Sequence, residues 1–285
     1  MRALVLGAGF LGRRIASAIP GARLADCADI TSRGSVQAAV VSNRAEVVIN
    51  AAGKTGRPNV DECETIRKET YRANVVGALT VAEVCEDAGA HLVHLGSGCV
   101  FYGRSPHPDG AWRESDFPNP ISFYSKSKAA SDLVLAALPD VAVVRLRMPI
   151  DSAPHDRNLI TKIARYPRVI AVVNSVTIVS DLLDVIRQIA ERRLSGIFHA
   201  TNPGVVSHRQ ILALYRELVD PSHTCEIISE EQLVSEGLAL KTRSNCVLAD
   251  ERLAAAGIRM RPVEEALRDV MIEYANRSPR RAARS

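Results

Sequence analysis

Long apolar runs are missing from this sequence of 285 residues. No run reaches the roughly 18 to 20 residues that a membrane-spanning helix needs. The N-terminus leads directly into a strand-like segment without a cleavage-site pattern. We therefore expect a cytoplasmic protein that has no association with membranes.

Cysteine pairs with the spacing of a metal site or a disulfide framework are also missing. The six cysteines lie at positions 27, 63, 85, 99, 225 and 246, with no C-x-x-C among them and no ligand-spaced histidines beside them. The sequence therefore predicts neither a structural zinc site nor a set of disulfides, and we expect no bound metal.

Most of the chain lacks an excess of positive charge. The formal net charge of +4 comes from 36 Lys and Arg against 32 Asp and Glu. Four of the arginines lie in residues 277–285, which contain no acid, so the rest of the chain is neutral. A neutral body lacks the basic face that a nucleic-acid backbone requires. We therefore expect no nucleic-acid partner, and we expect residues 277–285 to form a disordered basic tail.

The chain does contain an apolar fraction of 47%, arranged as short strand-like and longer helix-like segments in alternation. This composition excludes a disordered body. Alternating units with apolar, β-branched strands predict an α/β fold with a doubly wound parallel sheet of the Rossmann type. The expected strands are residues 3–6, 23–25, 47–50, 91–95 and 141–146, and the expected helices are 13–19, 36–41, 66–88 and 124–137.

The alternation loosens after Arg147, where helix-like stretches dominate. These stretches are residues 159–164, 180–191, 208–219 and 263–274. We predict a dinucleotide-binding domain over residues 1–148, with a return segment near 169–197, and a smaller, mostly helical substrate-binding lobe over residues 149–276. Prolines punctuate this lobe, as is typical of loops that close over a ligand.

Gly7, Gly9 and Gly12 match G-x-G-x-x-G between a predicted strand and a predicted helix. In this context, missing side chains let the backbone approach a pyrophosphate, whose charge is favoured by the helix N-terminus. We therefore expect the loop, including Phe10 and Leu11, to bind a dinucleotide. The alternative is a glycine-rich turn without a ligand.

The sequence gives conflicting indications about which nicotinamide cofactor binds. Asp26 lies 19 positions after Gly7, just after a strand, where an acidic residue takes the adenosine ribose hydroxyls and favours NAD(H). Arg13 and Arg14 oppose this, because an arginine can pair with the 2′-phosphate of NADP(H), although both can equally form a solvated first turn. NADP(H) and NAD(H) therefore both stay open.

Tyr124 and Lys128 lie four residues apart on one face of a predicted helix. A lysine cation beside a phenol stabilises the phenolate, so the pair can exchange a proton nearer neutral pH. Ser97 follows the strand 91–95, where its hydroxyl can bind a carbonyl that gains negative charge. Cys99 would share the face of Ser97 in an extended chain, and its alternative role is that of an apolar filler.

These residues together resemble the extended short-chain dehydrogenase/reductases. Longer strings are similar to the bifunctional nucleotide-rhamnose synthase/epimerase-reductases, within the dTDP-4-dehydrorhamnose reductase-like superfamily. The strings are residues 54–61, 98–101, 122–126, 145–150, 158–166, 201–208 and 243–245, and the resemblance covers residues 47–276. It implies NAD(P)H-dependent 3,5-epimerisation and 4-reduction of a UDP- or dTDP-4-keto-6-deoxy-D-glucose, which gives nucleotide-L-rhamnose or a related 6-deoxy sugar.

The resemblance also implies a division of roles. Cys99 and Lys162 would act as base and acid on opposite sides of the sugar ring, while Ser97 and Tyr124 hold the enolate oxygen. Lys162 is one of only six lysines in an arginine-rich chain, which favours a specific role over a surface charge. The alternatives are a 4-ketoreductase without epimerase activity and a non-catalytic regulatory protein that keeps the dinucleotide fold.

The remaining site residues are weaker expectations from the same resemblance. Asn74 would support Lys128, and relatives of this kind are commonly homodimers. Asn158 and Arg243 would hold the diphosphate, with a helix cap or a surface charge as the alternative role of each. The other cofactor residues would be Asp29, Ile30, Ala51, Ala52, Gly53 and Met148, and the other substrate residues would be Thr55, Arg57 and Asn59.

Overall fold

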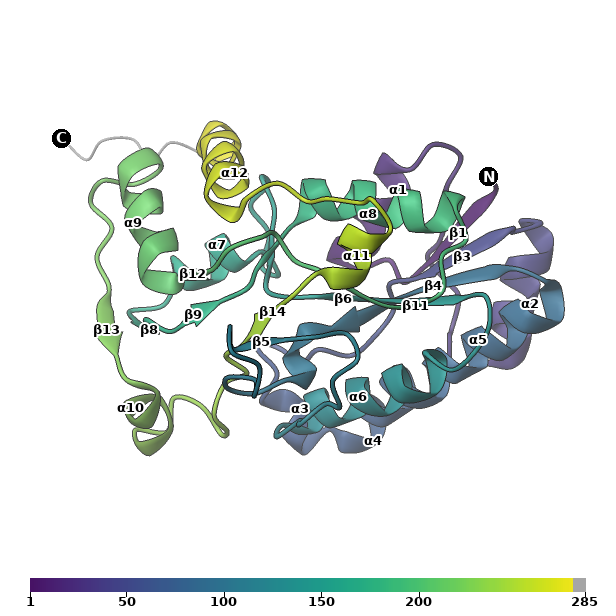
Figure 1. The fold of residues 1–285 in the computed structure, drawn as a ribbon, viewed down its shortest axis with the longest axis horizontal. Helices are drawn as coiled ribbons and strands as arrows, with labels where there is room; N and C mark the ends of the chain where they lie inside the picture. Colours follow the sequence, from purple (N-terminus) through teal and green to yellow (C-terminus); the bar gives the residue numbers. More distant parts are fainter. Residues whose placement is uncertain (279–285) are drawn as a thin grey trace.

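The computed structural model of the chain describes residues 1–278, in which a six-stranded sheet between helices adjoins a smaller lobe (Figure 1). Every neighbouring pair of strands in this sheet is parallel. The strand order changes direction at β1, and doubly wound sheets bind ligands beyond the carboxyl ends of their strands at such a point. The predicted α/β fold is confirmed. In spatial order the strands are β2 (Arg23–Ala25), β1 (Ala3–Leu6), β3 (Val47–Asn50), β4 (His91–Ser97), β6 (Val141–Leu146) and β11 (Gly196–Ala200).

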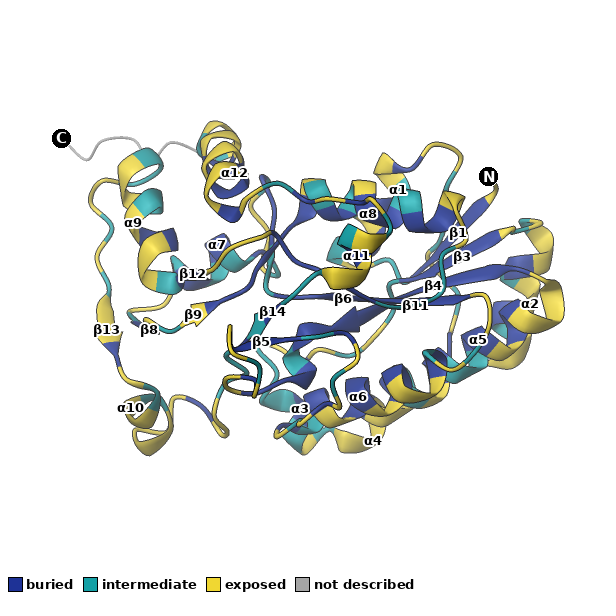
Figure 2. Ribbon diagram, viewed as in Figure 1, coloured by how far each residue is buried: buried dark blue, intermediate teal, exposed yellow. Residues whose placement is uncertain are grey.

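Both faces of the sheet are covered by helices, and β1, β3, β4 and β6 are buried throughout (Figure 2). In β1, Ala3 and Val5 pack into one apolar cluster, whereas Leu4 and Leu6 pack into the other. This explains why the strands read as apolar runs without polar alternation. One cluster holds α1 (Phe10–Ala18), α8 (Val179–Glu191) and α11 (Glu251–Ala255), and the other holds α2 (Arg33–Ser42), α5 (Gly77–Ala88) and α6 (Phe123–Leu135).

The segment after β3 differs from the single helix predicted over residues 66–88. It contains α3 (Glu62–Thr65), α4 (Arg67–Tyr71), a π-helical turn η1 (Arg72–Val76) and then α5. Residues 67–88 are helical without a break, as predicted, but the π turn between α4 and α5 was not predicted. Such turns often occur at functional sites, and this one carries Asn74.

The lobe has its own apolar core, which includes Ile150, Ile178, Ile211 and Met271. In the described part of the chain, four two-stranded sheets pair β7 with β10, β9 with β12, β8 with β13 and β5 with β14, so the lobe contains more strand than predicted. The elements are β5 (Ala111–Trp112), β7 (Pro149–Ile150), α7 (Leu159–Ile163), β8 (Arg168–Ile170), β9 (Val173–Asn174), β10 (Thr177–Ile178), β12 (Val206–Ser207), α9 (His208–Leu218), β13 (Glu226–Ile228), α10 (Glu230–Ser235), β14 (Val247–Leu248) and α12 (Val263–Arg277).

The chain passes repeatedly between the sheet and the lobe. After β10 it returns to the sheet through α8 and β11, which pairs with β6. It enters the lobe again at β12, and later Leu253, Ile258 and Met260 pack against the sheet before α12 rejoins the lobe. Residues 179–200 therefore pack with the sheet, whereas residues 169–178 of the predicted return segment pack with the lobe.

The structure describes two residues of the predicted tail, Arg277 and Ser278. Arg277 is the last residue of α12, and its Nη2 donates to Glu273. The rest of the predicted tail, residues 279–285, lies outside the described residues. Within residues 1–278, no helix has the length and apolarity to span a membrane, and no group of three or more His, Cys, Asp or Glu side chains is placed to hold a metal.

Candidate active site

The three glycines after β1 have different surroundings. A Cβ on Gly7, whose φ is +95°, would lie 2.5 Å from the Ala52 nitrogen, and a Cβ on Gly12 would lie 1.8 Å from the Gly7 oxygen. A Cβ on Gly9 would meet nothing within 4 Å. Gly7 and Gly12 therefore permit close backbone packing, whereas Gly9 leaves open space before the N-terminus of α1. No side chain caps this helix, so its first amides can bind an anion.

Phe10 and Leu11 turn their side chains away from this space. The Phe10 ring stacks on His155 of the lobe, with 4.6 Å between the ring centroids, and Leu11 packs against the sheet core. Their backbone amides lie at the uncapped start of α1, where an anion can bind.

The three predicted cofactor residues after β2 differ in their exposure and in their hydrogen bonds. Asp26 is exposed directly after the strand. The Asp29 carboxylate accepts hydrogen bonds from the Thr31 N–H and hydroxyl, which lower the pKa of Asp29, and Ile30 is buried against Gly77. Asp26 is thus better placed than Asp29 or Ile30 to meet a ligand.

The two arginines of the first turn of α1 also differ. Arg14 Nε lies 2.8 Å from the buried carboxylate of Asp151, so its charge is already paired. Arg13 is exposed and is the one of the two that a 2′-phosphate can reach.

The other predicted cofactor residues lie at the carboxyl ends of two strands. Ala51, Ala52 and Gly53 follow β3, and the Ala51 N–H donates to the Leu6 oxygen of β1. Met148 follows β6 with a φ of +41°. A side chain in this left-handed region costs on the order of 1–3 kcal/mol, and such residues cluster at functional sites.

Tyr124 and Lys128 lie in the first two turns of α6, whose N-cap Ser122 accepts a hydrogen bond from the Ser125 N–H. Burial raises the pKa of Tyr124, the charge of an ionised Cys99 raises it further, and a hydrogen bond with Ser97 lowers it. These contacts bring Ser97, Cys99 and Tyr124 together.

Lys128 is directed toward β4. Its Nζ lies 2.9 Å from His94 Nε2 and 2.8 Å from the Leu95 oxygen, and its burial lowers its pKa. The partners of Lys128 in the described part of the chain therefore do not include the Tyr124 hydroxyl.

The chain after Ser97 is not extended. Gly98–Val100 form a 3₁₀ turn, η2, and the Ser97 hydroxyl accepts a hydrogen bond from the Cys99 N–H at 3.2 Å. The extended-chain argument for Cys99 was therefore wrong, although the turn still leaves the two side chains near each other.

Arg147 is a site residue that the sequence did not single out. It is 1% exposed, and its Nη1 lies 3.5 Å from Cys99 Sγ. Nη1 and Nη2 also donate to Ser244 and Asn174, Nε has no hydrogen-bond partner, and within residues 1–278 Arg147 forms no ion pair with a carboxylate. An arginine directly after the mainly apolar strand β6 was the signal that could have found it.

Lys162 of α7 completes the group. Its pKa is lowered by burial and by the charges of Arg157 and Arg243, and an ionised Cys99 opposes this shift. The charge of an ionised Cys99 thus acts on both Tyr124 and Lys162.

Asn74 acts on Lys128 only indirectly. Its Nδ2 donates to the Lys54 oxygen and to Ser127 Oγ, both at 2.9 Å, and its Oδ1 accepts from the Lys54 N–H at 2.7 Å. It thereby joins the loop after β3 to the residue that precedes Lys128.

The predicted substrate residues of the loop after β3 are partly engaged in turn formation. Asn59 accepts a hydrogen bond from the Asp61 N–H, which is the turn chemistry considered as its alternative. Thr55 and Arg57 are exposed, and the Gly56 oxygen accepts from Arg157 Nη1 at 2.6 Å. Thr55 and Arg57 therefore remain able to meet a substrate.

Asn158 is a helix cap. It is fully buried, and its Oδ1 accepts from the Ile160 N–H at the start of α7, while its Nδ2 donates to the oxygens of Asp151 and Ala153. These bonds agree with the alternative role of Asn158 as a helix cap. They use both N–H groups of its side-chain amide, so neither is left for a diphosphate.

Arg243 is held by a carboxylate. Its two terminal nitrogens each lie 2.8 Å from one oxygen of Asp61, which follows β3. The pair joins the lobe to the sheet domain, so a diphosphate at Arg243 would compete with Asp61.

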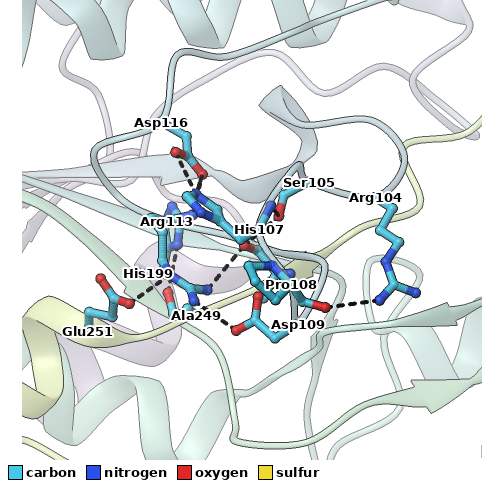
Figure 3. A network of polar contacts seen from close by, with 11 residues as sticks. Arg104, Ser105, His107, Pro108, Asp109, Arg113, Asp116, His199, Ala249 and Glu251 are labelled. Atoms are coloured by element: carbon cyan, nitrogen blue, oxygen red, sulfur yellow. Dashed lines mark hydrogen bonds and ion pairs between the residues drawn. The ribbon is translucent and has the colours of Figure 1, made fainter.

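The loop between Cys99 and Tyr124 is fastened by a polar network (Figure 3). His107 Nε2 lies 3.0 Å from Asp116, and Arg113 bridges Asp109 at 2.8 Å and Glu251 at 2.6 Å. Glu251 begins α11, so the network ties this loop to a distant segment and fixes the path between two site residues.

A family model described as the RmlD substrate binding domain matches residues 1–276. The chain belongs to this family. It is 42% identical over 243 residues to the bifunctional dTDP-4-dehydrorhamnose 3,5-epimerase/dTDP-4-dehydrorhamnose reductase of Arabidopsis thaliana, which covers 84% of this chain and 80% of that relative. The resemblance inferred from the motifs is confirmed.

Solved structures of similar fold agree with this family. The L780 UDP-rhamnose synthase from Acanthamoeba polyphaga mimivirus superposes with a TM-score of 0.87 and 28% identity, over 95% of this chain and 99% of that chain. The dTDP-4-dehydrorhamnose reductase from Bacillus anthracis in complex with NADP gives a TM-score of 0.83 and 26% identity, over 95% and 99%.

Proposed function

We propose that the chain is a 3,5-epimerase/4-reductase that converts a UDP- or dTDP-linked 4-keto-6-deoxy-D-glucose to nucleotide-L-rhamnose or a related 6-deoxy sugar. The observation that carries the proposal is the position of Cys99, whose backbone N–H donates to the Ser97 hydroxyl and whose charge would act on both Tyr124 and Lys162. A reductase alone needs Ser97, Tyr124 and Lys128 but has no use for an acid–base pair formed by Cys99 and Lys162. The similarity to a bifunctional relative supports the same conclusion.

The loop from Gly7 to Gly12 fits a nicotinamide dinucleotide, because it combines open space at Gly9 with an uncapped helix N-terminus. The bound cofactor, NADP(H) or NAD(H), would supply the hydride for C4. Asp26 would take the adenosine ribose of NAD(H), whereas the exposed Arg13 would pair with the 2′-phosphate of NADP(H).

The epimerase step requires removal of an acidified proton beside the C4 ketone and its return on the opposite face. Arg147 Nη1 donates to Cys99 Sγ at 3.5 Å, and this cationic donor lies beside the sulfur, so we assign Cys99 as the base. Lys162, whose pKa burial lowers, is the acid. The hydroxyls of Ser97 and Tyr124 would hold the enolate oxygen, and Tyr124 would deliver the proton during reduction.

Hydrogen exchange in D₂O tests this function. The protein is incubated with the 4-keto sugar nucleotide without reduced cofactor, and deuterium is expected at C3 and C5. Cys99→Ser should abolish this exchange while reduction of an already epimerised substrate survives. Absence of deuterium in the wild type would leave the 4-ketoreductase function, and absence of cofactor oxidation as well would leave a non-catalytic protein.

The assembly and location belong to the same proposal. We expect a homodimer in the cytoplasm, with the nucleotide sugar as the ligand of the lobe. Light scattering measures the first, and fractionation of cells that express the chain measures the second.

A further inference from the structure

A buried chain of three polar side chains lies beneath the site, on the face of the sheet that α6 covers. Asn50 of β3, His94 of β4 and Lys128 of α6 are 0%, 1% and 5% exposed. Asn50 Nδ2 lies 3.2 Å from His94 Nδ1, and His94 Nε2 lies 2.9 Å from Lys128 Nζ. Neither Asn50 nor His94 has a role in the proposed reaction.

The direction of the first hydrogen bond is fixed by a neighbouring backbone group. Asn50 Oδ1 accepts from the Ala52 N–H at 3.1 Å, so the amide nitrogen of Asn50 is the atom that faces His94. An amide NH₂ donates and cannot accept. His94 Nδ1 is therefore an acceptor and carries no proton.

The proton of His94 then lies on Nε2. Complete burial holds the pKa of His94 well below its usual value, so the ring is neutral. A neutral imidazole with a bare Nδ1 carries its single proton on Nε2, and this N–H points at Lys128 Nζ. An ammonium group has three donors and no acceptor, so only an uncharged amine can accept this bond. The amine has two N–H groups left, and one donates to the Leu95 oxygen.

We propose that His94, oriented by Asn50, is a positioning residue that holds Lys128 as an uncharged amine at rest. The proposal rests on the proposed function only for the role of Lys128 beside Tyr124. When Lys128 leaves His94 to activate Tyr124, its nitrogen takes one proton from solvent and becomes the ammonium, while His94 keeps its own Nε2 proton. The cation that stabilises the phenolate then forms only when Lys128 turns toward the reaction.

The charged and titratable groups around Lys128 are compatible with an uncharged amine. Asp132, one turn along α6, favours the ammonium, but its carboxylate pairs with Arg145 of β6 at 2.9 Å. Tyr124 on α6 carries no charge at neutral pH, because burial raises its pKa.

Lysine NMR tests the proposal without substrate or cofactor. The chain has six lysines, so protein labelled with ¹³C at lysine Cε gives few signals, and Lys128→Met identifies the one of interest. At pH 8 the Lys128 signal is expected at the position of an amine, separate from the signals of exposed lysines such as Lys126. Histidine ¹⁵N spectra should show a protonated Nε2 on His94.

His94→Gln removes the ring but keeps an oxygen that can accept from an ammonium. In this variant the Lys128 signal should move to the ammonium position at pH 8. His91→Gln is the matched control. His91 is a second buried histidine on the same strand, and because it lies three residues from His94 its side chain is on the opposite face of the sheet. This control should leave the Lys128 signal unchanged.

The pH profile of reduction gives a readout that a purely structural role would not move. The alkaline limb of kcat/KM reports the free protein, so in His94→Gln it should shift to higher pH by about one unit, a tenfold change along the limb. An ammonium signal from Lys128 in the wild type at pH 8, or an unchanged signal in His94→Gln, would overturn the proposal. Failure of deuterium exchange at C3 and C5 would instead contradict the proposed epimerase, because the NMR experiment contains no sugar nucleotide.

Discussion

At the scale of single residues, the glycines after β1 serve two purposes. Gly12 is needed for backbone packing, and Gly9 is needed for binding. Gly12→Ala places a Cβ against the Gly7 oxygen and should lower the free energy of unfolding by about 1–3 kcal/mol. Gly9→Ala meets open space, so it should change stability by no more than about 1 kcal/mol. It should nevertheless raise the Kd of the dinucleotide about tenfold or more, since the methyl group occupies the approach to the backbone. Urea titration and fluorescence binding measure the two effects, and equal destabilisation by both variants would contradict this division.

Arg147 allows a second prediction at this scale. Arg147→Gln keeps a donor near Cys99 but removes the positive charge, so alkylation of Cys99 by iodoacetamide near pH 7.5 should slow by about tenfold. Peptide mass mapping separates Cys99 from the exposed Cys27, whose rate serves as the internal control. An unchanged rate at Cys99 would remove the reason for assigning it as the base.

At the scale of elements, one buried ion pair fastens α6 to the sheet. Arg145 Nε of β6 lies 2.9 Å from Asp132 of α6, and both side chains are completely buried. Arg145→Met leaves a buried carboxylate without its partner and should cost about 3–5 kcal/mol of stability. Arg145→Met combined with Asp132→Leu should recover most of the loss, because neither charge remains. Chemical unfolding of both variants measures this, and a double variant no more stable than the single one would show that packing dominates.

The elements that sequence patterns located well are those buried on both faces or following a glycine motif. β1, β3 and β6 have the residue bounds predicted for them, because a strand that is buried on both faces of a parallel sheet is an apolar run in the sequence. The partly exposed strand β2 also has its predicted bounds. The short strands of the lobe could not be predicted in the same way. Each contains only two or three residues, too few for a period to appear, and each is defined by a partner far away in the chain.

The candidate site divides along a similar line. Ser97, Tyr124 and Lys162 could be found because their residue types and motifs carry chemistry. The roles of Asn158 and Arg243 could not be read in advance, since a cap and an ion pair depend on the partners that the fold supplies. Arg147 and His94 were missed for a related reason: a polar residue in an apolar strand becomes meaningful only when the atoms it faces are known.

At the scale of the whole molecule, buried neutral histidines make stability depend on acidity. Burial and the charge of Arg145 lower the pKa of His199 to about 3 from 6.5. His199 is therefore uncharged in both states above pH 6.5, whereas below it the unfolded chain binds a proton that the folded chain does not. The free energy of unfolding should fall by about 1.4 kcal/mol per pH unit between about pH 6.5 and 3 through this residue alone.

His199→Asn provides the comparison. Unfolding in urea at about pH 7.5 and pH 4.5 should show a smaller loss of stability in the variant than in the wild type. Equal losses in the two proteins would mean that other groups account for the acid sensitivity. The wild-type bond from His199 Nδ1 to the Ala249 oxygen is 2.8 Å long, so the variant is expected to be less stable at both pH values.

The repeated passage of the chain between the sheet and the lobe limits how the protein can be divided. Neither part corresponds to one continuous stretch of sequence, because α8, β11 and residues 253–260 pack with the sheet although lobe elements precede and follow them. A single backbone cleavage in a lobe loop would leave both fragments held in the sheet core, so a nicked protein should stay assembled until it is denatured. Expression of residues 149–276 alone should give a chain with an exposed apolar face rather than an isolated substrate-binding module.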